Sequence, residues 1–293
     1  MIAEATENES ANPFERLPDG AMWVNPRFRA RLKEAGLDSF ETVMTAARGR
    51  CLREQAVREN WYLPGDQATA AAPGLYLKKH HVRTLGSRLR ALLGLGPGET
   101  PARQETRNVT VLNADGIAAM HVVAYGERLR PDGQQESFLL TEELRGYEDL
   151  DRRLRKRRSY QRARQRNACD RDRRALILAV ADVARRFHSA GYNHRDFYCC
   201  HFFAKKTGRN KFEIRLIDLQ RIQHRRWFRR RWLVKDLAQL AWSVPHGALS
   251  PSERMLFIKR YLGVTRLRPA DRRLIREVLG KQQIMARRLG IKV

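Results

Sequence analysis

Apolar and polar residues between positions 50 and 144 follow the pattern of strands around one helix. Four segments have strand character, at residues 50–63, 74–83, 120–129 and 137–144. Between the first two, residues 64–73 carry Pro and Gly at both ends, which predicts a turn. A helix is expected from Pro101 to about Leu112, because Thr100 can cap it and proline fits the first helical position.

The segments on either side of this block have a different pattern. Residues 1–20 predict a loose tail, and residues 26–47 have helical spacing that breaks near Gly36. Later helices are expected at residues 176–187, at 233–243, from Pro251 onward and within 269–291. A hairpin is predicted from residues 202–205 and 212–218, with its turn at Thr207-Gly208-Arg209-Asn210.

Together these elements predict an α+β fold with two lobes around a cleft. Residues 49–144 would form a small, mainly antiparallel β lobe, and residues 145–293 a larger helical lobe. Residues 1–48 would form an N-terminal tail and helical extension. The chain of 293 residues is long enough for this plan.

The most informative polar residues follow the predicted helix that ends near Gly191. His194-Arg195-Asp196 is followed by His201, five residues after the aspartate. Asp218 comes later, inside the apolar run Leu216–Leu219. Two acids arranged in this way are typical of protein-kinase-like phosphotransferases, in which one receives a hydroxyl proton and the other holds the magnesium of ATP.

Each of these side chains has a candidate role. Asp196 is the candidate catalytic acid–base residue, and Asp218 the candidate Mg²⁺ ligand, because a hard cation prefers carboxylate oxygen. His201 stands where kinases usually have an asparagine that binds a second magnesium. Imidazole is a poorer magnesium ligand, so His201 has two candidate roles, metal binding and contact with phosphate. A simpler interpretation of Asp218 is a buried strand-end acid paired with Arg221.

A kinase also needs a cation on the phosphates of ATP. In Leu75-Tyr76-Leu77-Lys78, strand alternation places Tyr76 and Lys78 on one face, with Lys79 facing away. Glu105, on the helix that begins at Pro101, is the best candidate for the acidic partner of Lys78. Glu142 lies in the segment 139–144, which fits a link between lobes whose backbone groups would meet adenine.

The charge of the chain predicts an anionic partner. Its net charge is +26; residues 152–174 are crowded with arginine, and residues 219–235 contain no acid. Trp227, Phe228 and Trp232 lie among the second group of cations, which suits a membrane interface and would also suit stacking on bases. Beside a kinase motif, an anionic glycolipid is favoured over nucleic acid, for which no recognition motif is apparent.

Cysteine usage and terminal composition predict the compartment. The 4 cysteines do not form a disulfide framework, and residues 1–10 do not resemble a signal peptide. No run approaches the roughly 20 apolar residues of a membrane span. A zinc site at Cys199, Cys200 and His201 is disfavoured, because adjacent cysteines rarely chelate one ion. We expect a cytoplasmic protein whose charge permits peripheral contact with the cytoplasmic face of the inner membrane.

Three motifs together resemble one known family. These are His194-Arg195-Asp196 followed by Cys200-His201-Phe202, then Ile217-Asp218-Leu219-Gln220-Arg221, then Lys235-Asp236-Leu237-Ala238. The chain resembles the lipopolysaccharide kinases of the Kdo and WaaP type, over roughly residues 20–265. Within this pattern, Asp236 is expected to bond the backbone of the catalytic loop.

The resemblance implies a protein-kinase-like fold and ATP-dependent phosphorylation of a sugar in the inner core of lipopolysaccharide, most often a heptose. It implies Asp196 as catalytic residue, Lys78 and Glu105 as the nucleotide pair, and Asp218 as metal ligand, with ATP and Mg²⁺ bound. Two departures from ordinary protein kinases are the glycine-poor turn after the first strand and the absence of Phe-Gly after Asp218.

Two alternatives stay open at the level of sequence. The acceptor could be Kdo or another lipid-linked glycan rather than heptose. The chain could also be a kinase-fold binding protein without transfer activity, which the histidine at position 201 and the glycine-poor turn favour and which Lys78, Asp196 and Asp218 oppose.

Overall fold

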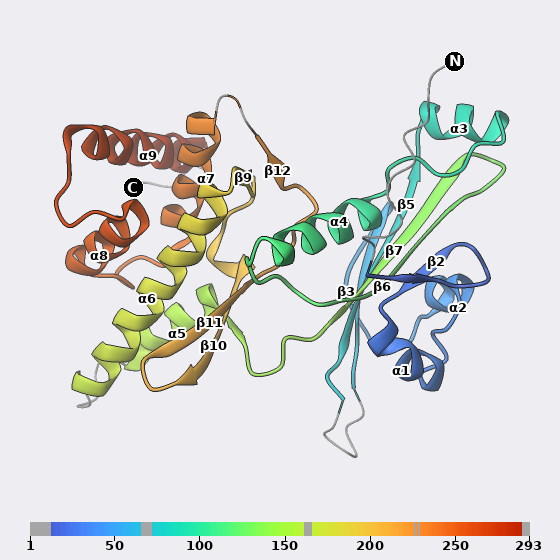
Figure 1. Cartoon of the computed structure of the whole chain (residues 1–293), viewed down its shortest axis with the longest axis horizontal. Coiled ribbons are helices and arrows are strands. Elements are labelled where there is room, and N and C mark those ends of the chain that lie inside the picture. Colours follow the sequence, from blue (N-terminus) through green and yellow to red (C-terminus); the bar gives the residue numbers. More distant parts are fainter. Residues whose placement is uncertain (1–12, 66–71, 161–165, 226, 228, 289–293) are drawn as a thin grey trace. The chain divides into compact units, whose positions relative to one another are not determined.

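The computed structural model describes residues 13–65, 72–160, 166–225, 227 and 229–288. It divides into two compact units, traced in Figure 1. The first contains the described residues up to Val109 together with His121–Glu143. The second contains Thr110–Met120 and the described residues from Leu144 onward.

The first unit is built on one sheet of antiparallel pairs, several strands of which are labelled in Figure 1. Its strand order is β1-β2-β6-β7-β5-β4-β3. The strands are β1 (Glu15–Arg16), β2 (Met22–Val24), β3 (Arg50–Gln55), β4 (Arg58–Leu63), β5 (Leu75–Arg83), β6 (Val122–Leu129) and β7 (Gln134–Glu142). β5 lies between β7 and β4, which fixes its register on both sides.

The core of this unit lies on one face of the sheet. Leu75 and Leu77 of β5 are buried there with Phe138 and Leu140 of β7. The helices α1 (Arg29–Glu34) and α2 (Phe40–Thr45) add further buried side chains to the same cluster. Since successive strand residues face opposite sides, this burial determines which residues of β5 point away from the core.

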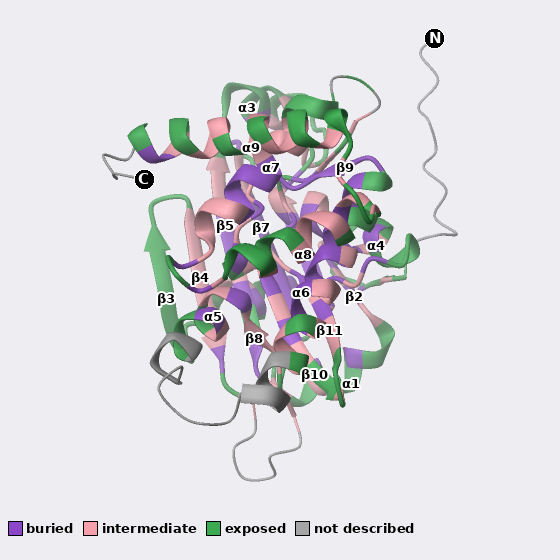
Figure 2. Cartoon of the chain, turned by 90° about the vertical axis from the view of Figure 1, so that its left-hand side faces the viewer, coloured by how far each residue is buried: buried purple, intermediate pink, exposed green. Residues whose placement is uncertain are grey.

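The predicted strand at residues 50–63 is wrong, because two strands occupy this segment. β3 and β4 form a hairpin that turns at Ala56–Val57, so the turn after the first strand lies there and not at residues 64–73. Ala and Val are not turn formers, and every residue of β3 is exposed (Figure 2), so neither turn residues nor hydrophobic alternation marked the break. Residues 66–71 of the predicted turn lie outside the described residues.

Three further elements of the first unit were not predicted. β1 and β2 lie within and just after the segment expected to be a loose tail, and they extend the sheet beside β6. The helix α3 (Leu85–Leu92) follows β5 directly. The helix α4 (Pro101–Ala114), predicted from Pro101, begins in the first unit and ends in the second.

The second unit is mainly helical. Its larger helices are α5 (Leu150–Tyr160), α6 (Arg166–Ser189), α7 (Arg229–Ser243), α8 (Pro251–Leu262) and α9 (Pro269–Arg288). Its short strands are β8 (Glu148–Asp149), β9 (Tyr192–Asn193), β10 (Phe202–Gly208), β11 (Lys211–Leu216) and β12 (Gln223–His224).

Local signals explain several boundaries in this unit. α6 ends at Ser189, and Gly191 follows in the left-handed region with φ of 94°. Ser250 and Glu253 form the capping box predicted for α8. β10 and β11 form the predicted hairpin, in which Phe202 pairs with Leu216. The residues that flank this pair, His201 and Ile217, are therefore neighbours too, and the Ile217 amide donates to the His201 carbonyl at 3.1 Å.

Candidate active site

In the first unit, Lys78 and Glu105 form the predicted ion pair. Lys78 lies on the face of β5 opposite the core, and its Nζ donates to the two carboxylate oxygens of Glu105 on α4 at 2.8 and 3.0 Å. The Glu105 side chain is only 1% exposed and that of Lys78 is 16% exposed. A carboxylate buried this deeply needs such a cation, so the pair fixes the position of the Lys78 ammonium group.

The neighbouring Lys79 points to the other side of the strand, as the alternation predicts. Its Nζ donates to the carbonyl of Ala46 at 2.8 Å and lies 5.6 Å from the centre of the Trp61 ring. Burial lowers the pKa of Lys79, partly offset by the nearby carboxylate of Glu59. The two adjacent lysines therefore have different environments: Lys78 pairs with Glu105 on the face opposite the core, and Lys79 is buried on the core face, 3.7 Å from Glu59.

The carboxylate of Glu142, at the end of β7, contacts basic side chains of the first unit. Arg31 approaches it at 3.3 Å and His121 Nδ1 at 3.1 Å. The Glu142 amide donates to the His121 carbonyl at 3.0 Å, and the Glu143 amide donates to the Gly74 carbonyl at 2.8 Å. These amides already have acceptors, so a nucleotide contact from this segment would use other backbone groups.

In the second unit, one face of α7 holds the backbone of the His-Arg-Asp loop. The carboxylate of Asp236 accepts from the amides of His194 and Arg195 at 2.7 and 3.0 Å, which confirms its expected role. One turn further along α7, Gln239 Oε1 accepts from the Phe197 amide at 3.2 Å.

The third contact comes from Ser243, whose Oγ accepts from the Cys199 amide at 2.8 Å. Positions 236, 239 and 243 share a helix face, because their spacing is close to one and two turns. Arg195 is strained in the left-handed region with φ of 71°, and these bonds hold it there.

His194 is a buried, neutral structural residue. Burial lowers its pKa to about 4, and the neighbouring His201 adds to the shift. Its Nε2 lies 3.2 Å from the Ile217 carbonyl, an acceptor, so Nε2 carries the proton. Its ring stacks on that of His201 with the centroids 5.6 Å apart. His194 thereby connects the His-Arg-Asp loop to the segment that carries Asp218.

His201 lies between the two candidate acids. Its Nδ1 is 2.7 Å from the backbone carbonyl of Asp196, so Nδ1 carries a proton and donates. Its Nε2 is 3.8 Å from Oδ2 of Asp218. The structure therefore brings Asp196, His201 and Asp218 together, although the described residues contain no cluster of three or more His, Cys, Asp and Glu side chains fit to hold a metal.

Arg221 pairs with Asp196, and this differs from the partner that the simpler interpretation of Asp218 gave it. The Arg221 guanidinium donates to both carboxylate oxygens of Asp196 at 2.9 and 3.2 Å. The expected burial of Asp218 is wrong, since its side chain is 36% exposed. The φ of Asp218 is 56°, so the backbone is no longer extended at this residue, two positions after β11 ends. The alternation of buried and exposed side chains in β11 therefore does not apply to Asp218.

Lys235 is a second cation at this loop, for which the sequence predicted no role beyond its place in the third motif. Its Nζ donates to the Arg195 carbonyl at 2.7 Å, and burial lowers its pKa, partly offset by the charge of Asp196. Lys235 lies one position before Asp236 in the predicted motif. Its role, like that of Arg221, depends on contacts about 25 to 40 positions away in the sequence.

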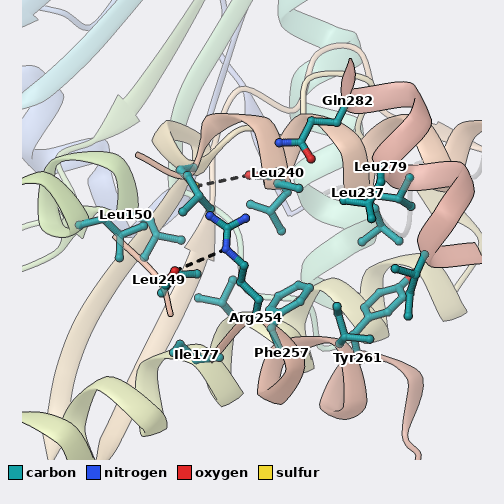
Figure 3. A pocket seen from close by; sticks show the side chains of 18 of the residues that line it. Leu150, Ile177, Leu237, Leu240, Leu249, Arg254, Phe257, Tyr261, Leu279 and Gln282 are labelled. Atoms are coloured by element: carbon teal, nitrogen blue, oxygen red, sulfur yellow. Dashed lines mark hydrogen bonds between the residues drawn. The ribbon is translucent and has the colours of Figure 1, made fainter. Parts of the chain in front are cut away.

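The helices of the second unit also enclose an apolar cavity of about 180 Å³ (Figure 3). Its walls come from α5 to α9, and aliphatic and aromatic side chains form nearly all of them. Those labelled in Figure 3 include Leu150, Ile177, Leu237, Leu240, Phe257 and Leu279. Such a lining suits a hydrocarbon group and does not suit a sugar or a nucleotide.

Comparison with known proteins identifies the family of this chain. Residues 32–261 match the lipopolysaccharide kinase (Kdo/WaaP) family. The lipopolysaccharide core heptose(I) kinase WaaP of Pseudomonas aeruginosa is 34% identical over 247 residues, 83% of this chain and 84% of that protein. This chain belongs to the lipopolysaccharide kinase (Kdo/WaaP) family.

Further relatives agree with this assignment. An Escherichia coli protein of the same name is 33% identical over 230 residues, 77% of this chain and 82% of that protein. A solved structure described as WaaP in complex with acyl carrier protein has a TM-score of 0.64 at 32% identity, covering 91% of this chain and 97% of that one. The family and the protein-kinase-like α+β fold predicted from the sequence are confirmed, and the chain is a kinase of this family. No helix in the described ranges has the length and apolar character needed to cross a membrane.

Proposed function

We propose that this chain transfers the γ-phosphate of ATP to a hydroxyl of a heptose in the inner core of lipopolysaccharide. The names of the relatives supply the acceptor. The observation that carries the proposal is the fixed loop of the second unit, in which His201 contacts the Asp196 backbone and lies beside Asp218. Protein-kinase-like phosphoryl transfer requires two acids placed in this way.

Asp196 is the proposed acid–base residue. Its carboxylate would orient the acceptor hydroxyl and receive its proton as the phosphoryl group is transferred. Arg221 donates to both carboxylate oxygens, which fixes the orientation of the carboxylate. The backbone on either side is fixed by Asp236 and Gln239, so the carboxylate is positioned before the substrate binds.

The donor atoms beside Asp218 fit a magnesium ion carried by ATP. His201 uses Nδ1–H on a backbone carbonyl, which leaves the lone pair of Nε2 on the side of the Asp218 carboxylate. Magnesium commonly takes one or two protein ligands and completes its shell with phosphate oxygens and water. Bound to Asp218 and His201, Mg²⁺ would offset the charge of the transferring phosphate.

Lys78 is the proposed phosphate-binding cation in the first unit, with Glu105 as its positioning partner. The pair resembles the lysine–glutamate pair of kinases in its strand and helix origins. We further propose that the segment around Glu142 meets adenine through backbone groups other than the Glu142 and Glu143 amides, since these already donate within the unit.

The apolar cavity supports a proposal about a partner. A solved relative is described as a complex with acyl carrier protein, and we propose that this chain also binds such a protein, with the acyl chain in the cavity. Replacing the cavity-lining Ala241 with Phe should remove acyl occupancy, measured by native mass spectrometry of the co-expressed pair. Ala91→Phe, a change outside the cavity, should leave occupancy unchanged; equal occupancy in Ala241→Phe would contradict the proposal.

Peripheral contact with the cytoplasmic face of the inner membrane is proposed for the same enzyme. Its acceptor is lipid-linked, and the side chain of Trp227 is 80% exposed within a segment rich in arginine. Phe228, named with it in the sequence, lies outside the described residues. Sedimentation with anionic vesicles, at low and high salt, tests this contact.

The test of the proposed function compares the wild type with Asp196→Asn. We expect the wild type to transfer phosphate from ATP to heptose-containing core oligosaccharide, and the variant to bind ATP without transferring it. If neither protein transfers phosphate while both bind nucleotide, the chain is a kinase-fold binding protein. If phosphate appears on Kdo, the acceptor assignment is wrong and the reaction type stands.

A further inference from the structure

The helix α3 exposes leucines where a helix of a soluble protein usually buries them. Leu85 and Leu92 are each 83% exposed, Leu89 is 57% exposed and Leu93 is 62% exposed, and Leu95 just after the helix is 49% exposed. The only buried residue of α3 is Ser87. A large contiguous apolar patch on a surface usually marks an interaction site.

The outward orientation of these leucines is built into the structure. Ser87 Oγ donates to the carbonyls of Gly133 and Thr84 at 2.7 and 2.9 Å, and Ser87 also closes a capping box with Thr84. At Gly133 an added Cβ would lie 2.7 Å from the Cα of Arg88, so the helix backbone packs directly on the β6–β7 turn. α3 is therefore attached through its polar face, and its apolar face is left to solvent.

The charge within the segment that carries the leucines is of one sign, and Asp132 in the adjoining β6–β7 turn lies 3.9 Å from the guanidinium of Arg83. Residues 82–98 contain Arg83, Arg88 and Arg90 and no Asp or Glu. Arg88 is exposed within α3, and Arg90 donates to the carbonyl of Gly96 at 2.9 Å. Leucines beside arginines on a short surface helix are the pattern of a segment that lies in the interface of an anionic bilayer.

Two other occupants fit this surface less well. A second copy of the chain would bring like charges together, since α3 is cationic and the whole chain has a net charge of +26. A protein partner usually meets a patch containing Trp, Tyr or Phe, and residues 82–98 contain none of these. The charge and the composition therefore favour lipid.

We propose that α3 docks this enzyme on an anionic membrane by inserting Leu85, Leu89, Leu92 and Leu93 among the lipid chains, with Arg88 at the level of the head groups. This inference deepens the membrane contact proposed above, because it names the inserting element, and it rests on that contact. Phosphoryl transfer to a water-soluble acceptor does not depend on it.

The test is co-sedimentation of the full chain with vesicles of phosphatidylcholine alone or mixed with phosphatidylglycerol. The wild type should bind the mixed vesicles, and the triple variant Leu85→Ser, Leu89→Ser, Leu92→Ser should bind at least about tenfold more weakly, since each leucine loses its buried apolar surface. Arg88→Gln should weaken binding mainly at low salt. The control is the double variant Met255→Ser, Ile284→Ser, which removes two exposed apolar side chains outside α3. It should bind like the wild type.

The other possible outcomes of this experiment each show which part of the proposal is wrong. If the triple variant binds as well as the wild type while Trp227→Ser does not, α3 is not the docking element. If the wild type binds neither kind of vesicle, both the docking role of α3 and the membrane contact proposed above are wrong. The proposed enzyme activity is then still tested separately, by phosphate transfer to soluble core oligosaccharide. If the wild type forms dimers in sedimentation analysis that the triple variant does not form, the surface is a contact between copies and the proposal is overturned.

Discussion

At the scale of single residues, the proposed chemistry depends on the carboxylate of Asp196. Asp196→Asn keeps the shape of the side chain and removes its ability to accept a proton. We expect kcat to fall by a factor of about 10² to 10⁴, with the unfolding temperature little changed. Asp182→Asn, which alters a surface pair with Arg260, is the matched control and should keep full activity. An Asp196→Asn enzyme with normal kcat would exclude Asp196 as the base.

The two adjacent lysines of β5 allow a second matched comparison. Lys78→Met removes the cation paired with Glu105, so kcat/KM for ATP should fall by a factor of about 10² or more. Lys79→Met makes the same chemical change on the core face, where the side chain packs against Trp61, and ATP kinetics should stay near those of the wild type. Equal losses in both variants would show that Lys78 has no special role toward phosphate.

His194 predicts a pH dependence of stability. Its folded pKa of about 4 lies below the unfolded value of about 6.5, because the buried imidazole stays neutral. Below pH 6.5 the unfolded chain therefore binds more protons than the folded chain. The contribution of His194 to the free energy of unfolding is complete above about pH 6.5 and is lost as the pH falls toward 4. The loss amounts to up to roughly 3 kcal/mol.

Denaturant unfolding between pH 7 and 5, where carboxylates contribute less, measures this loss. His194→Asn should show a flatter pH dependence than the wild type, although it is less stable at pH 7. His246→Asn, at an exposed position, should keep the slope of the wild type. An unchanged slope in His194→Asn would mean that His194 does not titrate in this way.

At the scale of elements, α7 supports the backbone of the His-Arg-Asp loop. Gln239→Leu leaves the buried Phe197 amide without its acceptor, so we expect a loss of about 1 to 3 kcal/mol in unfolding free energy together with a lower kcat. Gln283→Leu, on the exposed side of α9, is the control. If Gln239→Leu lowers stability and leaves kcat unchanged, α7 supports the fold and not the geometry of the loop.

Elements with strong local signals could be predicted from the sequence. α4, α8 and the β10–β11 hairpin have a cap, a proline or turn residues at their ends, and their positions were predicted closely. The β3–β4 hairpin was missed because β3 is exposed throughout and shows no apolar alternation. α3 was missed although Leu85, Leu89 and Leu92 have helical spacing, and it buries only a serine.

At the scale of the whole molecule, the ion pairs at the candidate site join residues far apart in the sequence. Local sequence patterns therefore do not predict them. Lys78 and Glu105 were predicted as a pair because a kinase needs a cation on the phosphates and an acid to hold it, and the structure shows the bond. Arg221 was considered only as a partner of Asp218 in the simpler interpretation of that acid, and the structure pairs it with Asp196. The φ of Asp218 sets the direction of the side chains after β11, and so determines which acid Arg221 reaches. This backbone angle cannot be predicted from amino-acid composition.

The most direct measurement is the fate of labelled phosphate on defined acceptors. The chain is incubated with γ-labelled ATP and core oligosaccharides that end either before or after the first heptose, and the product is located by NMR. The account predicts transfer only to the heptose-containing acceptor, with Mg²⁺ required and Asp196→Asn inactive. Equal labelling of both acceptors, or full transfer by Asp196→Asn, would contradict it.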